Sequence, residues 1–282
     1  MNELIDTHCH IQSSTKQTGP AGEAVTRSLW EKAGFPGGEQ LIAHAAEAGV
    51  TRMICVGCDL ADSQLAVDFA QDKPACWASI GIHPHEASHY MADGARNAAK
   101  LADFAALAGA PKVVAIGECG LDYFYEHSKP ADQQQILRFQ LELAAEHGLP
   151  LIFHVRQALD DFWPIFDEYN SAGKPLTGVL HSFTDTQAHL EQALARGLYI
   201  GVNGIATFTK SQEQLAMYKA IPLSRILLET DSPFLTPSPY RGKICEPYHI
   251  GVTAEFLAGL RQEPLEQLAA ATTANARKLF NL

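Results

Sequence analysis

The stretch QQQILRFQLELAAEHGLPLIFH, residues 133–154, contains the pattern that decides the fold. Its first part, residues 133–148, has apolar side chains three and four positions apart, which is the periodicity of a helix. The part that follows, residues 149–154, is an almost uninterrupted apolar run. Such runs are typical of strands that are buried on both faces of a parallel sheet. The stretch therefore predicts a helix followed by a parallel strand.

The same alternation extends over the whole chain. Eight apolar runs occupy residues 4–6, 52–57, 76–82, 112–117, 149–154, 177–181, 198–202 and 225–230. Helical patterns separate them, for example at residues 38–50, and a last one follows at residues 264–280. Eight strands alternating with helices predict an α/β fold, a single (β/α)8 or TIM barrel. No linker rich in Gly, Ser and Pro divides the sequence, so we expect one domain over residues 1–282.

The composition is that of an ordinary globular protein, with 46% hydrophobic and 19% charged residues. No apolar stretch approaches the ~18 residues of a membrane span, and no signal sequence is visible, so we expect a cytoplasmic protein without a membrane partner. The net charge of −11 is unfavourable for broad adhesion to nucleic acid. It is compatible with a phosphate bound locally at a metal centre, where divalent cations dominate the field. The oligomeric state is left open, and a monomer is compatible with the sequence.

Six cysteines are spread along the chain. Reduced thiols are expected in the cytoplasm. Cys55 and Cys58 have the C-x-x-C spacing of redox and zinc sites, but no second pair completes a set of four ligands. A structural role is therefore the expectation for both.

Polar side chains follow nearly every apolar run. They are His8, His10, Asp59, His83, Glu118, His154, Arg156, His181, Asn203 and Asp231. Active sites of (β/α)8 barrels lie at the C-terminal ends of the strands. We therefore expect these side chains to surround one mouth of the barrel.

The first of these runs, LIDTHCHIQ at residues 4–12, has two histidines two positions apart. Residues i and i+2 of a strand point to the same face, so His8 and His10 can reach one metal ion together. The alternative is a polar pair at a strand end, or a stray tag-like fragment, without a ligand role.

A candidate ligand set combines imidazoles and carboxylates. Its members are His8, His10, Glu118, His154, His181 and Asp231. These ligand types suit transition divalent ions, and the choice between Zn, Mn and Mg stays open. Glu118 stands near the middle of the chain and can bridge two ions with its two oxygens. Two cations held close together clamp a substrate oxyanion and generate hydroxide near neutral pH, so we expect two divalent ions per chain.

With these motifs in one order, the chain resembles the TatD family of metal-dependent deoxyribonucleases, within the larger amidohydrolase-like barrel group. The resemblance rests on IDTHCH, GIHPH, AIGECGLDY, QLELA, LPLIFHVRQA, LHSFTDT, IGVNGIATF, LLETDSPFLTP and RGK before EP. Residues 12–38 are longer than is usual in the family, and Ile244 and Cys245 stand where an Asn commonly precedes Glu-Pro. Residues 13–38 are also long for a first βα connection, and with the Pro-rich segment 232–247 they are candidate walls or a lid of the site.

The resemblance implies two ligand sets that share Glu118. One ion would be held by His8, His10, Glu118 and Asp231, and the other by Glu118, His154 and His181. It also implies hydrolysis of phosphodiester bonds, as a 3′ to 5′ exonuclease on DNA or other nucleic-acid ends. The alternative is an ester or amide hydrolase on the same barrel, such as a D-aminoacyl-tRNA deacylase. A non-catalytic metal-binding scaffold is disfavoured, because it needs no open two-metal site.

Three residues are expected to take part in catalysis: Asp231, Glu118 and His83. Asp231 would ligate a metal, orient the water and accept its proton, because a carboxylate beside a divalent cation stays ionised. His83 would contact the scissile phosphate or the leaving group, or would only support the ligands. His85 is left open. The other histidines are expected at the surface; they are His44, His89, His127, His147, His189 and His249.

Cations and aromatic residues near the strand ends are candidates for substrate contacts. Arg156 could hold a phosphate or pair with a surface carboxylate. Arg241 and Lys243 could contact backbone phosphates, or could lie in a solvated loop. Tyr123 and Phe124 could stack a base, although packing under the loop is the more usual fate.

Overall fold

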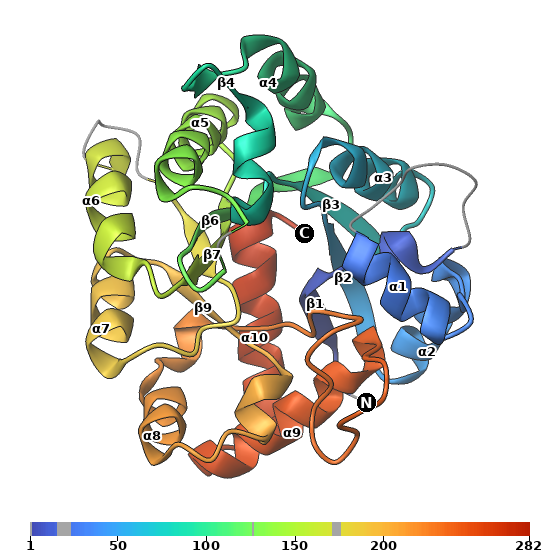
Figure 1. Ribbon diagram of the computed structural model, residues 1–282. Coiled ribbons are helices and arrows are strands. Elements are labelled where there is room, and N and C mark those ends of the chain that lie inside the picture. The colour runs from blue at the N-terminus through green and yellow to red at the C-terminus, as the bar shows by residue number, and fades with distance from the viewer. Residues whose placement is uncertain (1, 16–23, 126, 171–175) are drawn as a thin grey trace.

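The computed structural model describes residues 2–15, 24–125, 127–170 and 176–282 and has the predicted barrel architecture (Figure 1). Eight strands form one parallel sheet in the order β1-β2-β3-β6-β7-β8-β9-β10. They are β1 (Leu4–Cys9), β2 (Val50–Val56), β3 (Cys76–Ile80), β6 (Val113–Asp122), β7 (Leu151–Arg156), β8 (Gly178–Leu180), β9 (Tyr199–Val202) and β10 (Ile226–Leu228). Each strand overlaps one predicted apolar run, so the (β/α)8 prediction is confirmed. A two-stranded hairpin, β4 (Met91–Ala92) with β5 (Ala95–Arg96), was not predicted.

Helices surround the sheet (Figure 1). The described α-helices are α1 (Ala24–Lys32), α2 (Gly38–Glu47), α3 (Leu60–Gln71), α4 (Ala98–Ala105), α5 (Pro130–His147), α6 (Leu159–Asn170), α7 (Gln187–Ala195), α8 (Gln212–Ala220), α9 (Ile250–Arg261) and α10 (Leu265–Phe280). Short 3-10 segments are η1 (Ile11–Ser14), η2 (Pro84–Tyr90), η3 (Ala106–Gly109), η4 (Gly204–Thr207), η5 (Leu223–Arg225) and η6 (Pro247–His249). In the part of the chain that the structure describes, no helix is both long and apolar enough to cross a membrane.

The core has an inner and an outer part. The inner cluster consists of Ile5, Ile54, Val56, Ala115, Ile152, Val179, Tyr199 and Leu227 from the strands, with Ala276 and Phe280 from α10. The outer cluster packs the sheet against the surrounding helices. Helix α10 covers the end of the barrel where the strands begin, because Thr273 and Asn275 donate to the carbonyls of Glu3 and Ile226 there.

Asp6 joins the first strand to the last one, where the ladder of the sheet is incomplete. Its Oδ1 accepts the N–H of Thr230 (2.9 Å) and its Oδ2 accepts the hydroxyl of Thr230 (2.6 Å). Burial raises the pKa of the Asp6 carboxyl to about 7, even though the bonds from Thr230 oppose that rise. Next to this link the N–H of Asp231 donates to the carbonyl of His8 (2.8 Å). These hydrogen bonds between the first and the last strand therefore place Asp231 beside His8.

A bulge in β6 sets the position of Glu118. Ile116 pairs with Leu151 and Cys119 pairs with Phe153, so three residue steps on β6 match two on β7. An extra residue of this kind re-aims side chains near functional sites. After the bulge β6 continues to Asp122, beyond the predicted end of this run at residue 117.

The two segments that were predicted to form walls or a lid of the site differ in their position relative to the cavity. Within residues 13–38, the described part includes α1, whose fully buried Trp30 donates its indole N–H to the carbonyl of His10 (3.0 Å). This part packs beneath the strand end and is not an open lid; residues 16–23 lie outside the described residues. In the Pro-rich segment 232–247, Phe234 and Leu235 line the cavity at the barrel mouth and form a wall.

Candidate metal centre

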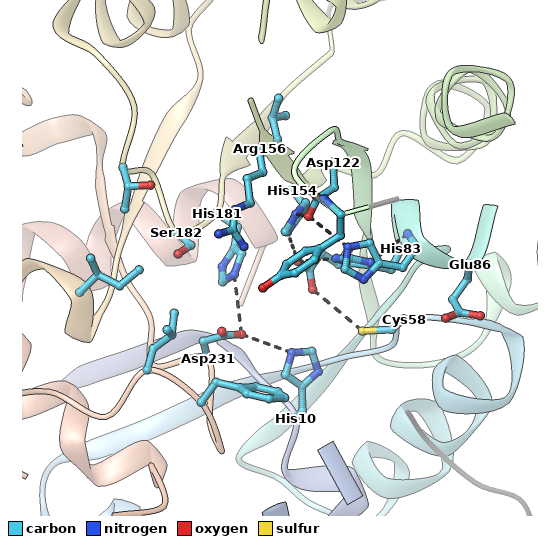
Figure 2. A pocket seen from close by; sticks show the side chains of 18 residues that line it. His10, Cys58, His83, Glu86, Asp122, His154, Arg156, His181, Ser182 and Asp231 are labelled. Carbon is cyan, nitrogen blue, oxygen red and sulfur yellow. Dashed lines mark hydrogen bonds and ion pairs between the residues drawn. The ribbon is translucent and has the colours of Figure 1, made fainter. Parts of the chain in front are cut away.

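The strands end at one cavity of about 430 Å³ (Figure 2). The predicted site residues that line it are His10, His83, Glu118, His154, Arg156, His181 and Asp231. His8 is fully buried and contacts four of these lining residues, His10, Glu118, His181 and Asp231. Asp59 caps α3 and Asn203 caps η4, so these two strand-end residues have local structural roles.

His8, His10 and Asp231 form a first cluster. Asp231 Oδ1 lies 3.4 Å from His10 Nε2 and 3.6 Å from His8 Nε2, and the two Nε2 atoms are 3.3 Å apart. One ligand atom of each residue lies within 4.8 Å of the others. The i, i+2 spacing at the end of β1 thus brings both imidazoles to one point, as the sequence predicts.

His83, Glu118 and His154 form a second cluster. Glu118 Oε1 lies 2.8 Å from His154 Nδ1 and 3.5 Å from His83 Nε2. The other oxygen, Oε2, lies 3.4 Å from His8 Nε2 in the first cluster. Glu118 therefore stands between the two clusters with one oxygen toward each.

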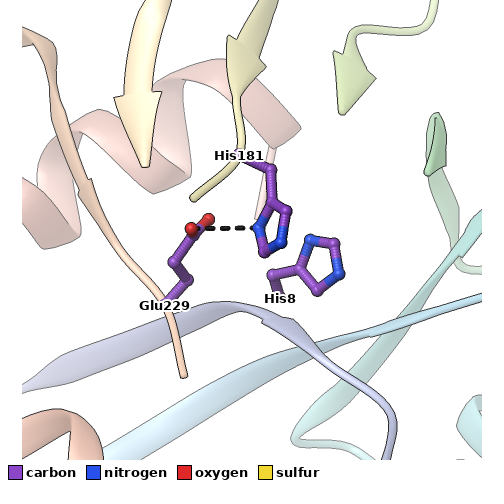
Figure 3. Close-up of side chains that lie close together, drawn as sticks. All are labelled: His8, His181 and Glu229. Atoms are coloured by element: carbon purple, nitrogen blue, oxygen red, sulfur yellow. Dashed lines mark ion pairs between the residues drawn. The ribbon is translucent and has the colours of Figure 1, made fainter. Parts of the chain in front are cut away.

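His181 differs from the expected grouping with His154 (Figure 3). Its ring stacks on that of His8, with centroids 3.6 Å apart, and its Nδ1 lies 2.9 Å from Glu229 Oε1. Its Nε2 is 3.7 Å from Asp231 Oδ1. The structure thus places His181 beside the first cluster, and His83 stands next to Glu118 and His154 in its place.

Three of the histidines have their second ring nitrogen next to an oxygen away from the centre. His10 Nδ1 lies 2.8 Å from the carbonyl of Val56, and His154 Nε2 lies 2.9 Å from Asp122 Oδ2. In the same way, Glu229 Oε1 lies 2.9 Å from Nδ1 of His181. Such partners orient metal-ligating histidines and select the tautomer, so this arrangement fits a metal centre.

Asp122 and Glu229 were missed in the sequence, although a signal was present. Glu229 precedes Asp231 by two residues and Asp122 follows Glu118 by four. Residues an even number of positions apart on a strand point to the same face, so each is expected on the same face as a predicted site residue. A side chain at Gly201 of β9 would also displace Glu229, because a Cβ there would lie 2.4 Å from Glu229 Oε2.

Electrostatics in the first cluster favour a bound cation. Burial lowers the pKa of His10, but the hydrogen bond and the charge of Asp231 outweigh it and raise this pKa to about 10. For His181 burial is likewise outweighed, chiefly by Glu229, and the pKa rises to about 9. Burial and the neighbouring His181 lower the pKa of His8, which keeps its imidazole neutral. A divalent cation held by these residues would take the place of protons on His10 and His181.

Comparison with known proteins identifies the family. A model of the family described as TatD related DNase matches residues 5–281. The chain belongs to this family. A curated relative from Erwinia tasmaniensis, named 3′-5′ ssDNA/RNA exonuclease TatD, is 39% identical over 250 residues, which cover 86% of this chain and 93% of the relative. Another, from Bacillus subtilis and named uncharacterized metal-dependent hydrolase YabD, is 32% identical over 279 residues and 99% of both chains.

Solved structures agree with the TatD assignment. The TatD homologue YjjV from Escherichia coli superposes with a TM-score of 0.81 at 28% identity, covering 99% of this chain and 98% of its own. A TatD family hydrolase from Entamoeba histolytica gives a TM-score of 0.79 at 22% identity, covering 99% of this chain and 98% of its own, and supports the fold alone. The resemblance to the TatD family is thus confirmed over nearly the whole chain.

The cationic residues expected to contact substrate lie at different places around the mouth of this TatD barrel. Arg156 is exposed at the cavity, and its guanidinium carbon lies 3.8 Å from the centroid of the Phe124 ring. Arg241 donates to the carbonyl of Thr236 and covers Phe208 instead of lining the cavity. Lys243 is exposed outside the cavity as well. Only Arg156 therefore lies at the site itself.

Two predictions for the remaining side chains need correction. His249 is buried, not at the surface, because its ring packs on Tyr248 and its Nδ1 accepts the N–H of Glu246. Phe124 is exposed, because its loop turns outward after β6, so packing under the loop applies to Tyr123 only. Cys58 lines the cavity with its Sγ 4.0 Å from Glu118 Oε2, and its structural role stays a prediction.

His85 gains a place in the site. It lines the cavity, and its Nε2 lies 3.1 Å from Asp122 Oδ2, the oxygen that also contacts His154. The sequence leaves its role open. The structure places it beside Asp122, the carboxylate that contacts His154 of the second cluster.

Proposed function

We propose that this TatD protein is a metal-dependent hydrolase that removes nucleotides from the 3′ end of single-stranded DNA or RNA. Family membership and the relatives named 3′-5′ ssDNA/RNA exonuclease support the reaction class. The single observation that carries the proposal is the position of Glu118, which directs one oxygen to each of two histidine clusters. An open pair of cation sites of this kind suits hydrolysis of a phosphodiester.

The donor set fits two divalent cations. His8, His10, Asp231 and one oxygen of Glu118 would hold one of them, with His181 beside it. The other oxygen of Glu118 would hold the second together with His154, and either His83 or His181 would complete that site. Bound there, the cations would supply Lewis-acid stabilisation of the phosphate and acidify the attacking water. Zn, Mn and Mg remain candidates, because ligand type alone does not decide among them.

The chain's own residues supply the proton transfer and the positioning. The side chain of Asp231 is 15% exposed and that of Glu118 is 6% exposed, so Asp231 is the more accessible of these two carboxylates. Burial raises its pKa, but the hydrogen bond from His10 and the charge of His181 hold this pKa below its usual value. An ionised, accessible carboxylate can orient a water molecule and accept its proton. Arg156 at the mouth would attract the phosphate, and His83 would assist the leaving oxygen unless it ligates.

The cellular setting is also a proposal. All six cysteines are buried thiols without a disulfide, which supports a reducing compartment such as the cytoplasm. The eight-stranded sheet runs from β1 to β10, and we propose that residues 1–282 act as one domain. A monomer is sufficient for the cluster, because every donor comes from one chain.

A substrate panel tests the proposed function. Metal-free protein would be incubated with 5′-labelled single-stranded DNA, the matched RNA, the matched duplex, aminoacylated tRNA and a generic phosphodiester, each with Mn²⁺, Mg²⁺, Zn²⁺ or no metal. We expect stepwise shortening of the single strands from the 3′ end, only with metal. Glu118→Gln should abolish most of it. Deacylation of tRNA without nucleotide release would favour the ester-hydrolase alternative, and metal-independent cleavage would contradict the proposal.

A further inference from the structure

An exposed aromatic pair adjoins the cavity at its mouth. Among the described residues the large hydrophobic side chains that are exposed are Val25, Phe124, Tyr125 and Tyr240. Phe124 is 47% exposed and Tyr125 is 43% exposed, and Tyr125 lines the cavity. Leaving two neighbouring rings in water is unfavourable, so a partner for them is expected.

Arg156 completes this surface, which we call the aromatic rim (Phe124, Tyr125 and Arg156). The Arg156 guanidinium carbon lies 3.8 Å from the centroid of Phe124 and 5.0 Å from that of Tyr125. The two rings meet edge to face, with centroids 4.7 Å apart. Among the described residues Arg156 thus contacts two rings and forms no ion pair with a carboxylate, so its guanidinium is available at the cavity entrance.

Asp122 fixes the aromatic rim relative to the candidate metal centre. Its Oδ1 accepts the backbone N–H groups of Phe124 (2.9 Å) and Tyr125 (3.1 Å). Its Oδ2 lies 2.9 Å from Nε2 of His154. A buried carboxylate that bonds to the backbone two and three residues ahead holds a local turn. One side chain thus orients both a candidate metal ligand and the two exposed rings.

The ligand that best matches this surface is planar, aromatic and attached to a phosphate. Aromatic rings and an arginine plane bind unstacked nucleobases of any sequence. The chain has a net charge of −11, so broad attraction of phosphates cannot supply the affinity. Stacking supplies affinity that does not depend on positive charge.

We propose that the aromatic rim stacks a base next to the scissile phosphate and so selects single-stranded ends. This inference rests on the proposed function and goes beyond it by naming a base-binding subsite. Tyr125, which lines the cavity, takes the base nearest the cleaved bond, and Phe124 widens the surface outward. In a duplex the bases are already stacked and paired, so they are not available to the rim.

A cycle of ring and base deletions tests this proposal. The variants are Phe124→Ala and Tyr125→Ala, and the substrates are a single-stranded oligonucleotide and a matched one whose last two nucleotides carry no base. On the normal oligonucleotide each variant should raise KM by about 5- to 150-fold with kcat little changed, from ~1–3 kcal/mol per stacked base. On the base-free end, variants and wild type should have the same KM.

Controls separate stacking from loss of structure. Phe124→Tyr and Tyr125→Phe keep a ring and should restore a KM near the wild-type value. Val25→Ala removes an exposed apolar side chain that does not line the cavity and should change nothing. The preference of the wild type for single strands over duplex should shrink in the alanine variants.

The outcomes distinguish this inference from the proposed function. If the wild type shortens oligonucleotides but the alanine variants have an unchanged KM, or an equal rise on both substrates, the base-binding subsite is wrong and the nuclease assignment stands. If the wild type neither cleaves nor binds a labelled oligonucleotide with any of the three metals, both proposals fall. If the alanine variants no longer distinguish the normal end from the base-free end but keep their kcat, both proposals are supported.

Discussion

Replacing Asp122 by Asn should weaken one of the two proposed metal sites and leave the other unchanged. The Asp122 oxygen that faces the backbone accepts two N–H groups, from Phe124 and Tyr125. An asparagine would keep its oxygen there and would turn its NH₂ toward His154 Nε2, 2.9 Å away. Two donors would then meet, unless the His154 proton moves to Nδ1. Since Nδ1 is the nitrogen that faces Glu118, at 2.8 Å, that shift would block ligation.

The magnitude follows from the role of such supporting carboxylates, whose loss typically costs about 10- to 100-fold in metal affinity. Metal-free wild type and Asp122→Asn would be titrated with Zn²⁺ or Mn²⁺ against a competing chelator. We expect one site with wild-type affinity and one that is weaker by that factor. Glu86→Gln is the matched control, because Glu86 lines the same cavity and pairs with the exposed His89. Two unchanged affinities in Asp122→Asn would refute the reasoning.

Three further predictions concern Asp231 as the general base, the protons that metal displaces from His10 and His181, and the packing of Phe280 in the inner cluster. Asp231→Asn should retain much of its metal and lose about 10²–10⁴-fold in kcat, because an amide cannot accept the proton; a near wild-type rate at equal metal occupancy would exclude Asp231 as the base. Because the pKa values of His10 and His181 are raised to about 10 and about 9, metal must displace their protons, so affinity should rise with pH toward that range. Calorimetry in buffers of different ionisation enthalpy would detect the protons, and identical heats would contradict this. Phe280→Ala should lower the free energy of unfolding in urea by about 3–5 kcal/mol, because Phe280 is 2% exposed, whereas Val25→Ala should change it by less than about 0.5 kcal/mol.

The fold could be predicted almost completely, because strands that are buried on both faces leave continuous apolar runs. The exceptions have physical reasons. Strand β6 extends past its apolar run into a segment that ends at Asp122, because those residues still pair with β7. The hairpin of β4 and β5 has only two residues in each strand, too few for a periodic signal.

The residues of the candidate site could be predicted from the sequence, but which of them lie together in each cluster could not. His8 and His10 were visible because alternation along a strand places them on one face. The positions of His83 and His181 depend on the angular order of strands and on rotamers, which no local pattern contains. Exposure of Phe124 likewise depends on a turn that Asp122 holds through its side chain.

Turnover as a function of bound metal tests the central claim most directly. Metal-free protein would receive Mn²⁺ in steps, and hydrolysis of a 3′-labelled single-stranded oligonucleotide would be measured against the number of ions bound per chain. We predict negligible turnover without metal, full turnover at two ions, and little turnover in Glu118→Gln at any loading, because Glu118 stands between the two clusters. Full turnover with no ion or one ion bound, or an active Glu118→Gln enzyme, would contradict the two-cation site proposed for this barrel.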